Sequence, residues 1–146
     1  MIEKTIEGIK YRFNEETLTA EVIQKNGYVG DIIIPETIVF NQVSYGVTSI
    51  GEEAFYGCDS LTSIVIPDSV TSIEESAFWY CSSLTSIVIP DSVTSIEESA
   101  FAGCSSLSSI TFNGTKAQWK GIKLGDGWKN NTPTKVIHCT DGEVEI

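Results

Sequence analysis

The chain has 146 residues, and its 20 Asp and Glu against 9 Lys and Arg give a net charge of −11. This length is typical of one domain, residues 1–146, and an apolar content of 41% is enough for a folded core. No apolar run reaches the roughly 18 residues of a membrane-spanning helix, so no membrane insertion is expected. Residues 26–112 contain eleven acids and no Lys or Arg. Such a field repels phosphate backbones, which argues against nucleic acid as a partner.

The N-terminal segment predicts a β-hairpin over residues 8–24. Ile9, Tyr11 and Phe13 alternate with charged side chains, and a second alternating run returns over residues 18–22. We expect residues 1–30 to form an N-terminal cap over the strands that follow, because uncovered strand edges pair with other chains. The first ten residues lack the apolar core of a signal peptide.

Residues 32–35, Ile-Ile-Ile-Pro, predict a short strand, and Ile-Val-Ile-Pro returns at residues 64–67 and 87–90. The first two prolines are 32 residues apart and the next two 23 apart, so nine residues are inserted after the first strand. Within residues 36–47, two apolar runs flank Asn41-Gln42, which predicts a small inserted hairpin. Such insertions can carry binding. Extension of the N-terminal cap is the simpler role.

Residues 58–80 are repeated almost unchanged as residues 81–103, and Cys104 begins a third copy. A fixed period of 23 residues indicates stacked, similar coils rather than a domain with a unique core, and helical repeats need about 33 residues or more. Three ladders with members 23 residues apart define the register: Cys58, Cys81 and Cys104; Leu61, Leu84 and Leu107; Phe55, Phe78 and Phe101.

Each coil should contain two short inward-facing runs. Residues 61–66 predict a strand that ends at Pro67, because a proline has no N–H to give to a ladder. The polar residues 68–69 turn the chain into a second run over residues 70–73. Residues 74–78 are expected to close the coil as one helical or 3₁₀ turn. Stacking of coils about 4.8 Å apart would join the strands of neighbouring coils by hydrogen bonds.

After residue 112 the repeat stops and the composition changes, so residues 113–146 predict a helix-plus-strand C-terminal cap. Trp119 and Trp128 are interpreted as the core of this cap rather than as ligand platforms. The cap would contain, in order, a helix that begins at the capping-box sequence Thr115-Lys-Ala-Gln118 and ends at residues 125–127, a strand over residues 135–139, and a tight turn at residues 141–142.

The repeat unit Cys-x-x-Leu-x-x-Ile-x-Ile-Pro-x-x-Val-x-x-Ile-x-x-x-Ala-Phe-x-x-Cys resembles the BspA-like (Treponema-type) leucine-rich repeat of bacterial surface proteins. The resemblance covers residues 32–112, and the Pro, Ala-Phe and Cys positions all coincide. Ser69 and Ser92 stand where ordinary leucine-rich repeats have an Asn ladder. We therefore expect a mainly β leucine-rich-repeat solenoid over residues 31–112, with short helical turns and the two caps.

The resemblance implies a secreted or surface-displayed adhesion and recognition module whose partners are host or matrix proteins. It implies no enzymatic activity and no cofactor, and it favours an export signal that was removed from the start of the chain. The residue inventory agrees with a non-catalytic role, because one His, no Gly-x-Ser-x-Gly and no phosphate-binding Gly-rich loop are present. A carbohydrate-binding surface and a structural spacer in a larger surface protein stay open as alternatives.

One candidate binding surface is the outward face of the strands. An apolar stripe there would be flanked by hydroxyl groups, and contiguous exposed apolar surface often marks a protein interface. Ordinary β-propensity explains these residues equally well. The stripe would consist of Ile33, Val65, Val88 and Thr111, one per coil, with Ser63, Ser86 and Ser109 beside them.

A second candidate surface is an aromatic cluster formed by Tyr56, Trp79 and Tyr80, which precede the ladder cysteines. Amphipathic aromatic side chains on a rigid scaffold suit binding hot spots or a sugar contact. Local packing is the simpler interpretation. Tyr80 replaces the glycine of the neighbouring coils, so a left-handed backbone there would be strained.

The paired glutamates at residues 52–53, 74–75 and 97–98 would stack as an acid ladder. Calcium could relieve their repulsion, but no Asp-x-Asp-x-Asp loop is present, and we assign no metal site. The ladder cysteines have parallel side-chain vectors, so we expect buried free thiols rather than disulfides. His138 adjoins Cys139, but no Cys-x₂-Cys pair accompanies them, which argues against zinc.

Overall fold

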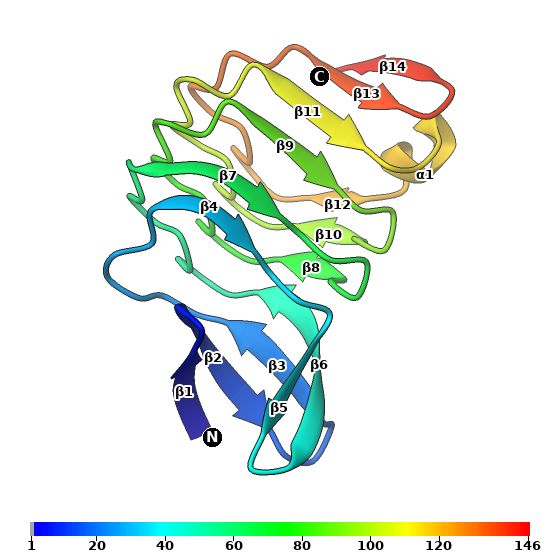
Figure 1. The fold of residues 1–146 in the computed structure, drawn as a ribbon. Coiled ribbons are helices and arrows are strands. Elements are labelled where there is room, and N and C mark those ends of the chain that lie inside the picture. The colour runs from blue at the N-terminus through cyan, green and yellow to red at the C-terminus, as the bar shows by residue number, and fades with distance from the viewer. Residues whose placement is uncertain (1) are drawn as a thin grey trace.

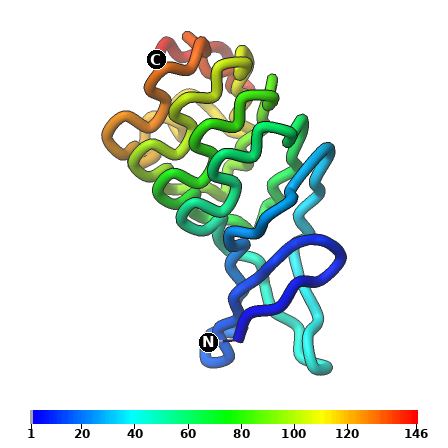
Figure 2. Tube along the Cα trace, turned by 90° about the vertical axis from the view of Figure 1, so that its left-hand side faces the viewer, coloured from blue at the N-terminus to red at the C-terminus, as the bar shows by residue number. Residues whose placement is uncertain are grey.

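The computed structural model describes residues 2–146 and shows a β-solenoid of about four turns, which confirms the mainly β fold that the 23-residue period predicts (Figure 1). Figure 2 shows the regular coils stacked above the N-terminal hairpins. The one helix of the described residues, α1, spans Lys116–Lys120. The strands are β1 (Ile2–Ile6), β2 (Ile9–Asn14), β3 (Thr19–Val22), β4 (Gly30–Ile33), β5 (Thr37–Phe40), β6 (Val43–Ile50), β7 (Leu61–Val65), β8 (Ser72–Ile73), β9 (Ser86–Ile89), β10 (Ser95–Ile96), β11 (Ser109–Phe112), β12 (Lys123–Leu124), β13 (Val136–Cys139) and β14 (Gly142–Glu145).

Two rows of short strands run along the solenoid. One row contains β4, β7, β9, β11 and β13, and the other contains β6, β8, β10 and β12 (Figure 1). Neighbours come from successive coils, since Ser72 pairs with Ser95 and Ile73 with Ile96. In the described chain, β7 and β9 lie side by side without pairing, so the expectation that all neighbouring strands pair is wrong there. The β8–β10 pairing and the buried ladders hold these two coils together.

The interior of the solenoid consists of side-chain columns. Leu61, Leu84 and Leu107 are fully buried in one hydrophobic core, as the period predicts. The Phe78 ring lies between those of Phe55 and Phe101, with centroids 5.2 and 5.1 Å away and planes within 4° of parallel. Residues 23 apart in the sequence are therefore packing partners.

The turn that closes each coil differs from the single helical or 3₁₀ turn expected at residues 74–78. Ser76 has φ 56° and Tyr80 has φ 61°, in the left-handed region, which a right-handed helix excludes. Successive N–H groups of the turn alternate between two kinds of acceptor. The Ala77 N–H donates to the Glu74 carbonyl of the same coil, and the Phe78 N–H donates to the Ala100 carbonyl of the next coil. The turns therefore form a third hydrogen-bonded side of the solenoid.

The thiols of the cysteine ladder donate further hydrogen bonds to backbone carbonyls of the turns on this third side. The Cys81 Sγ donates to the Phe55 carbonyl and the Cys104 Sγ to the Phe78 carbonyl, both over 3.0 Å. Cys81 and Cys104 are buried free thiols, as expected, whereas Cys58 at the first coil is only half-buried. Thr132 completes the series, since its hydroxyl donates to the Phe101 carbonyl over 2.6 Å.

The N-terminal cap is built from two hairpins. The predicted hairpin is present as β2 and β3, and β1, which the sequence did not predict, pairs antiparallel with β2. The predicted insertion is present as the β5–β6 hairpin, whose turn residues Asn41 and Gln42 both have positive φ, as a tight two-residue turn requires. Since β6 pairs with β3 on one side and β8 on the other, the insertion joins the cap to the coils.

The C-terminal helix begins where the capping box predicts. The Thr115 side chain accepts from the Gln118 N–H and the Gln118 side chain accepts from the Thr115 N–H. The helix ends at Gly121 and not at residues 125–127, so that part of the prediction is wrong. Trp119 and Trp128 are buried as cap core. No helix within residues 2–146 has the length and apolar character to cross a membrane.

Residues 123–139 continue the solenoid, although the sequence repeat ends at residue 112. The β12 strand pairs with β10, and β13 pairs with β11. The Phe101 N–H donates to the Trp128 carbonyl as the Phe78 N–H does to Ala100. The expectation that coiling stops at residue 112 is therefore wrong: a coil with a different sequence covers the last repeat before β14 closes the sheet.

Candidate functional site

The predicted stripe lies on the outer face of the β4, β7, β9 and β11 strands. Pairing places Ile33 opposite Val65, and Val88 opposite Thr111. The side chains of Ile33, Val65 and Val88 are 71%, 53% and 47% exposed, and Thr111 is half-buried. Their neighbours along the strands point inward, as the period-2 alternation of a strand requires. Three successive coils thus present a large apolar side chain to solvent on one face.

The predicted serines lie on the same outward face, two residues before the stripe. Ser63 and Ser86 are exposed and Ser109 is half-buried. The Ser63 hydroxyl donates to Asp31 Oδ1 over 2.7 Å. This bond and a second one from Thr62 hold the pKa of the Asp31 carboxyl below its ordinary value. Ser63 is therefore part of an anionic polar group at the edge of the stripe.

A pocket of about 420 Å³ opens between β7 and β9, in the middle of the stripe, where the two strands do not pair. Sequence reasoning missed it, because it depends on the interrupted pairing. The exposed carboxylates of Glu36 and Asp68 stand beside apolar walls. Its lining residues are Glu36, Ile64, Val65, Ile66, Pro67, Asp68, Val88 and Asn113.

The three predicted aromatic residues are brought together by the turns. Tyr56 lies edge-on to Trp79 at 5.2 Å and to Tyr80 at 6.4 Å, and Trp79 and Tyr80 stack at 5.1 Å. Tyr80 adopts φ 61° where Gly57 and Gly103 have 65° and 69°, so the predicted left-handed position is present. A Cβ on Gly103 would collide with the Tyr80 ring. The strained conformation therefore leaves Tyr80 packed over Gly103 with half of its surface in solvent.

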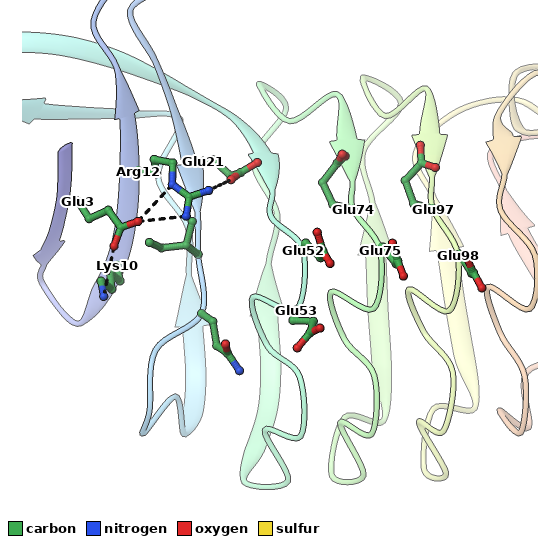
Figure 3. Close-up of a pocket in the computed structure, with 12 residues that line it drawn as sticks. Glu3, Lys10, Arg12, Glu21, Glu52, Glu53, Glu74, Glu75, Glu97 and Glu98 are labelled. Atoms are coloured by element: carbon green, nitrogen blue, oxygen red, sulfur yellow. Dashed lines mark hydrogen bonds and ion pairs between the residues drawn. The ribbon is translucent and has the colours of Figure 1, made fainter. Parts of the chain in front are cut away.

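The glutamate pairs line a second, larger pocket of about 830 Å³ (Figure 3). The N-terminal cap forms one end of this pocket, where Arg12 bonds to Glu3 over 3.0 Å and to Glu21 over 3.3 Å. Burial, followed by the neighbouring carboxylates of Glu97, Glu21 and Glu52, raises the pKa of Glu74. Residues 2–146 hold no cluster of three or more His, Cys, Asp or Glu arranged to hold a metal ion. The sequence repeat does not predict this pocket, because Glu3, Arg12 and Glu21 belong to the N-terminal cap and lie outside the repeat.

Solved structures of bacterial proteins share this fold. A leucine-rich repeat protein from Bacteroides ovatus is 31% identical over 93% of this chain, with a TM-score of 0.77, and the chain spans 37% of that protein's length. A leucine-rich repeat protein from Bacteroides capillosus is 25% identical, with 94% of this chain and 97% of that chain covered and a TM-score of 0.78. A leucine-rich cell surface protein from Faecalibacterium prausnitzii, 24% identical with a TM-score of 0.68 over 97% of this chain and 43% of its own, shares the fold.

No curated protein matches the chain significantly. The sequence pattern of the BspA-type leucine-rich repeat region matches residues 23–121 in 6 copies. This range is wider than the residues 32–112 on which the resemblance rested, and it reaches into both caps. The chain belongs to the BspA-type leucine-rich repeat family.

Proposed function

We propose that this chain is a non-catalytic recognition module that binds a protein ligand through the outer strand face. The observation that carries the proposal is the exposure of Ile33, Val65 and Val88, three large apolar side chains on successive coils. A hydrogen-bonded scaffold holds them, so few degrees of freedom are lost on binding. The stripe and its flanking serines and Thr111 would form the contact surface.

The partner class is a host or matrix protein, and the location is the bacterial cell surface. Membership of the leucine-rich repeat family supports a recognition role, and the Faecalibacterium prausnitzii protein with the same fold is described as a cell surface protein. The eleven acids and absent bases of residues 26–112 favour a partner with a basic rim. A secreted location and adhesion are part of the same proposal.

The proposal is tested with immobilised, purified matrix proteins such as collagen, fibronectin and laminin. Wild type and the Val65→Asp/Val88→Asp double variant are compared by biolayer interferometry. The matched control is Val29→Asp/Val39→Asp, which changes two valines that are 59% and 65% exposed away from the stripe. We expect the stripe variant to lose at least tenfold in affinity and the control to bind like wild type. Equal binding of all three proteins refutes the proposal, provided that circular dichroism shows the same fold.

A second candidate function is carbohydrate binding by Tyr56, Trp79 and Tyr80. The observation that favours it is Tyr80, whose left-handed backbone is strained while half of its side chain remains exposed. Trp79→Ala should abolish signals on a glycan array and leave a stripe-mediated protein contact intact. A chain that binds neither glycans nor matrix proteins would be a structural spacer.

A further inference from the structure

The pocket between β7 and β9 divides the proposed binding face. The β4–β7 pair and the β9–β11 pair are each hydrogen-bonded, whereas β7 and β9 do not pair in the described residues. The facing strand edges therefore keep backbone carbonyls that a ligand could use as acceptors. Since Val65 and Val88 line this pocket and also belong to the stripe, an occupant would contact both.

The lining of the pocket combines two kinds of surface. The side chains of Ile64, Ile66 and Pro67 are apolar, and so are the stripe valines. The carboxylates of Glu36 and Asp68 are exposed, and neither belongs to any ion pair within residues 2–146. The pocket thus offers apolar contact together with two uncompensated negative charges.

A side chain that matches both surfaces has a long apolar stem and a cationic head with several donors. Arginine fits this description, because its methylene groups pack on apolar surface while its planar guanidinium donates to carboxylates and carbonyls in a fixed fork. Lysine offers only a point charge. A second copy of this chain is a poor source, since each copy carries a net charge of −11 and its solenoid has no basic residue from 26 to 112.

We propose that the pocket between β7 and β9 receives an arginine side chain of the protein partner, with its stem between Val65 and Val88 and its guanidinium at Glu36 and Asp68. This proposal rests on the proposed function, because it names the anchor residue of the same binding face. Arginine is enriched among the residues that dominate binding energy at interfaces, which agrees with this assignment.

The test uses two small probes of the same shape. N-acetyl-L-arginine amide is titrated into the ¹⁵N-labelled protein, and N-acetyl-L-citrulline amide, which is nearly isosteric and uncharged, serves as the matched probe. We expect saturable shifts of the Val65, Val88 and Asn113 amide resonances with the arginine probe. The citrulline probe should bind about tenfold more weakly, which corresponds to about 1.4 kcal/mol, because it lacks the charge that strengthens hydrogen bonds to carboxylates.

The Glu36→Gln/Asp68→Asn variant should also weaken the arginine probe about tenfold. The control variant Glu52→Gln/Asp59→Asn removes the same charge away from the pocket and should bind like wild type. Equal binding of both probes, shifts that map elsewhere, or equal weakening in the two variants would overturn the proposal. Failure of the probe at this pocket, with stripe-dependent binding to a matrix protein intact, would overturn the arginine anchor and leave the proposed function standing.

Discussion

The central ring of the phenylalanine column, Phe78, offers a sharp test of how the coils hold together. Its side chain is fully buried, and its ring stacks on Phe55 and on Phe101. Replacing it with alanine removes both stacked pairs and leaves a cavity between two coils. The neighbouring rings are held by their own backbone ladders, so they cannot close that cavity by a small movement.

The packing around Phe78 indicates how much the free energy of unfolding should fall in the Phe78→Ala variant. A buried Phe→Ala change typically costs about 3–5 kcal/mol, and aromatic pairs contribute roughly 0.5–1.5 kcal/mol each beyond the buried area. Phe55 and Phe101 would each lose their parallel-stacked partner and keep only the tilted Tyr28 ring and the edge-on Trp128 ring. Phe78→Ala should therefore lower the free energy of unfolding by about 4 kcal/mol. For a chain of this size, that corresponds to a fall in Tm of about 8–16 °C.

The assay is urea unfolding followed by circular dichroism, together with a thermal melt. Phe40→Ala is the comparison, because Phe40 also stacks, on Phe13 at 5.0 Å, but is only half-buried at the end of the cap. It should cost less than half as much. A loss below about 2 kcal/mol for Phe78→Ala, or an equal loss in the two variants, would show that the column does not hold the coils together.

Three further predictions concern single positions. Thr132→Val removes the hydroxyl that bonds to the Phe101 carbonyl and should lower the free energy of unfolding by about 1–3 kcal/mol, whereas Thr132→Ser should stay near wild type in urea unfolding. Glu53→Gly should raise Tm, because Glu53 has φ 56° and glycine adopts this conformation without the cost of roughly 1 kcal/mol that other residues bear. An unchanged or lower Tm in a thermal melt would contradict this prediction. Burial and neighbouring carboxylates raise the pKa of Glu74 above its ordinary value of 4.5. The stabilising contribution of the neutral carboxyl is therefore fully present below pH 4.5 and is lost as the pH rises through the raised pKa. Glu74→Gln should therefore stabilise the protein at pH 7 and change little at pH 4, and chemical unfolding at the two pH values checks this sign.

The register of the coils could be predicted from the sequence because it depends on short, regularly spaced motifs. A column such as Leu61, Leu84 and Leu107 needs only equal spacing and apolar side chains, and all three are fully buried. The capping box at Thr115 and the turn at Asn41-Gln42 are likewise short-range signals, and both are present.

The features that the sequence did not reveal depend on distant parts of the chain. The last coil keeps the backbone bonding of the repeat but has Trp128 at the position equivalent to Ala100 and Thr132 at that of the ladder Cys, so a search for the repeated letters misses it. The acidic pocket needs Arg12 of the cap, and the pocket beside Val65 needs the interrupted pairing. Binding by the stripe and by the aromatic cluster stays a prediction.

The near identity of the two central coils affects how the chain can reach this fold. Residues 58–80 and 81–103 differ only at Asp59/Ser82, Trp79/Ala102 and Tyr80/Gly103. Early in refolding, the later coil can dock where the earlier one belongs, and the cost of looping out the skipped segment grows only slowly with its length. We expect such slipped species to form kinetic traps that must reopen before the C-terminal coil can dock in its native place.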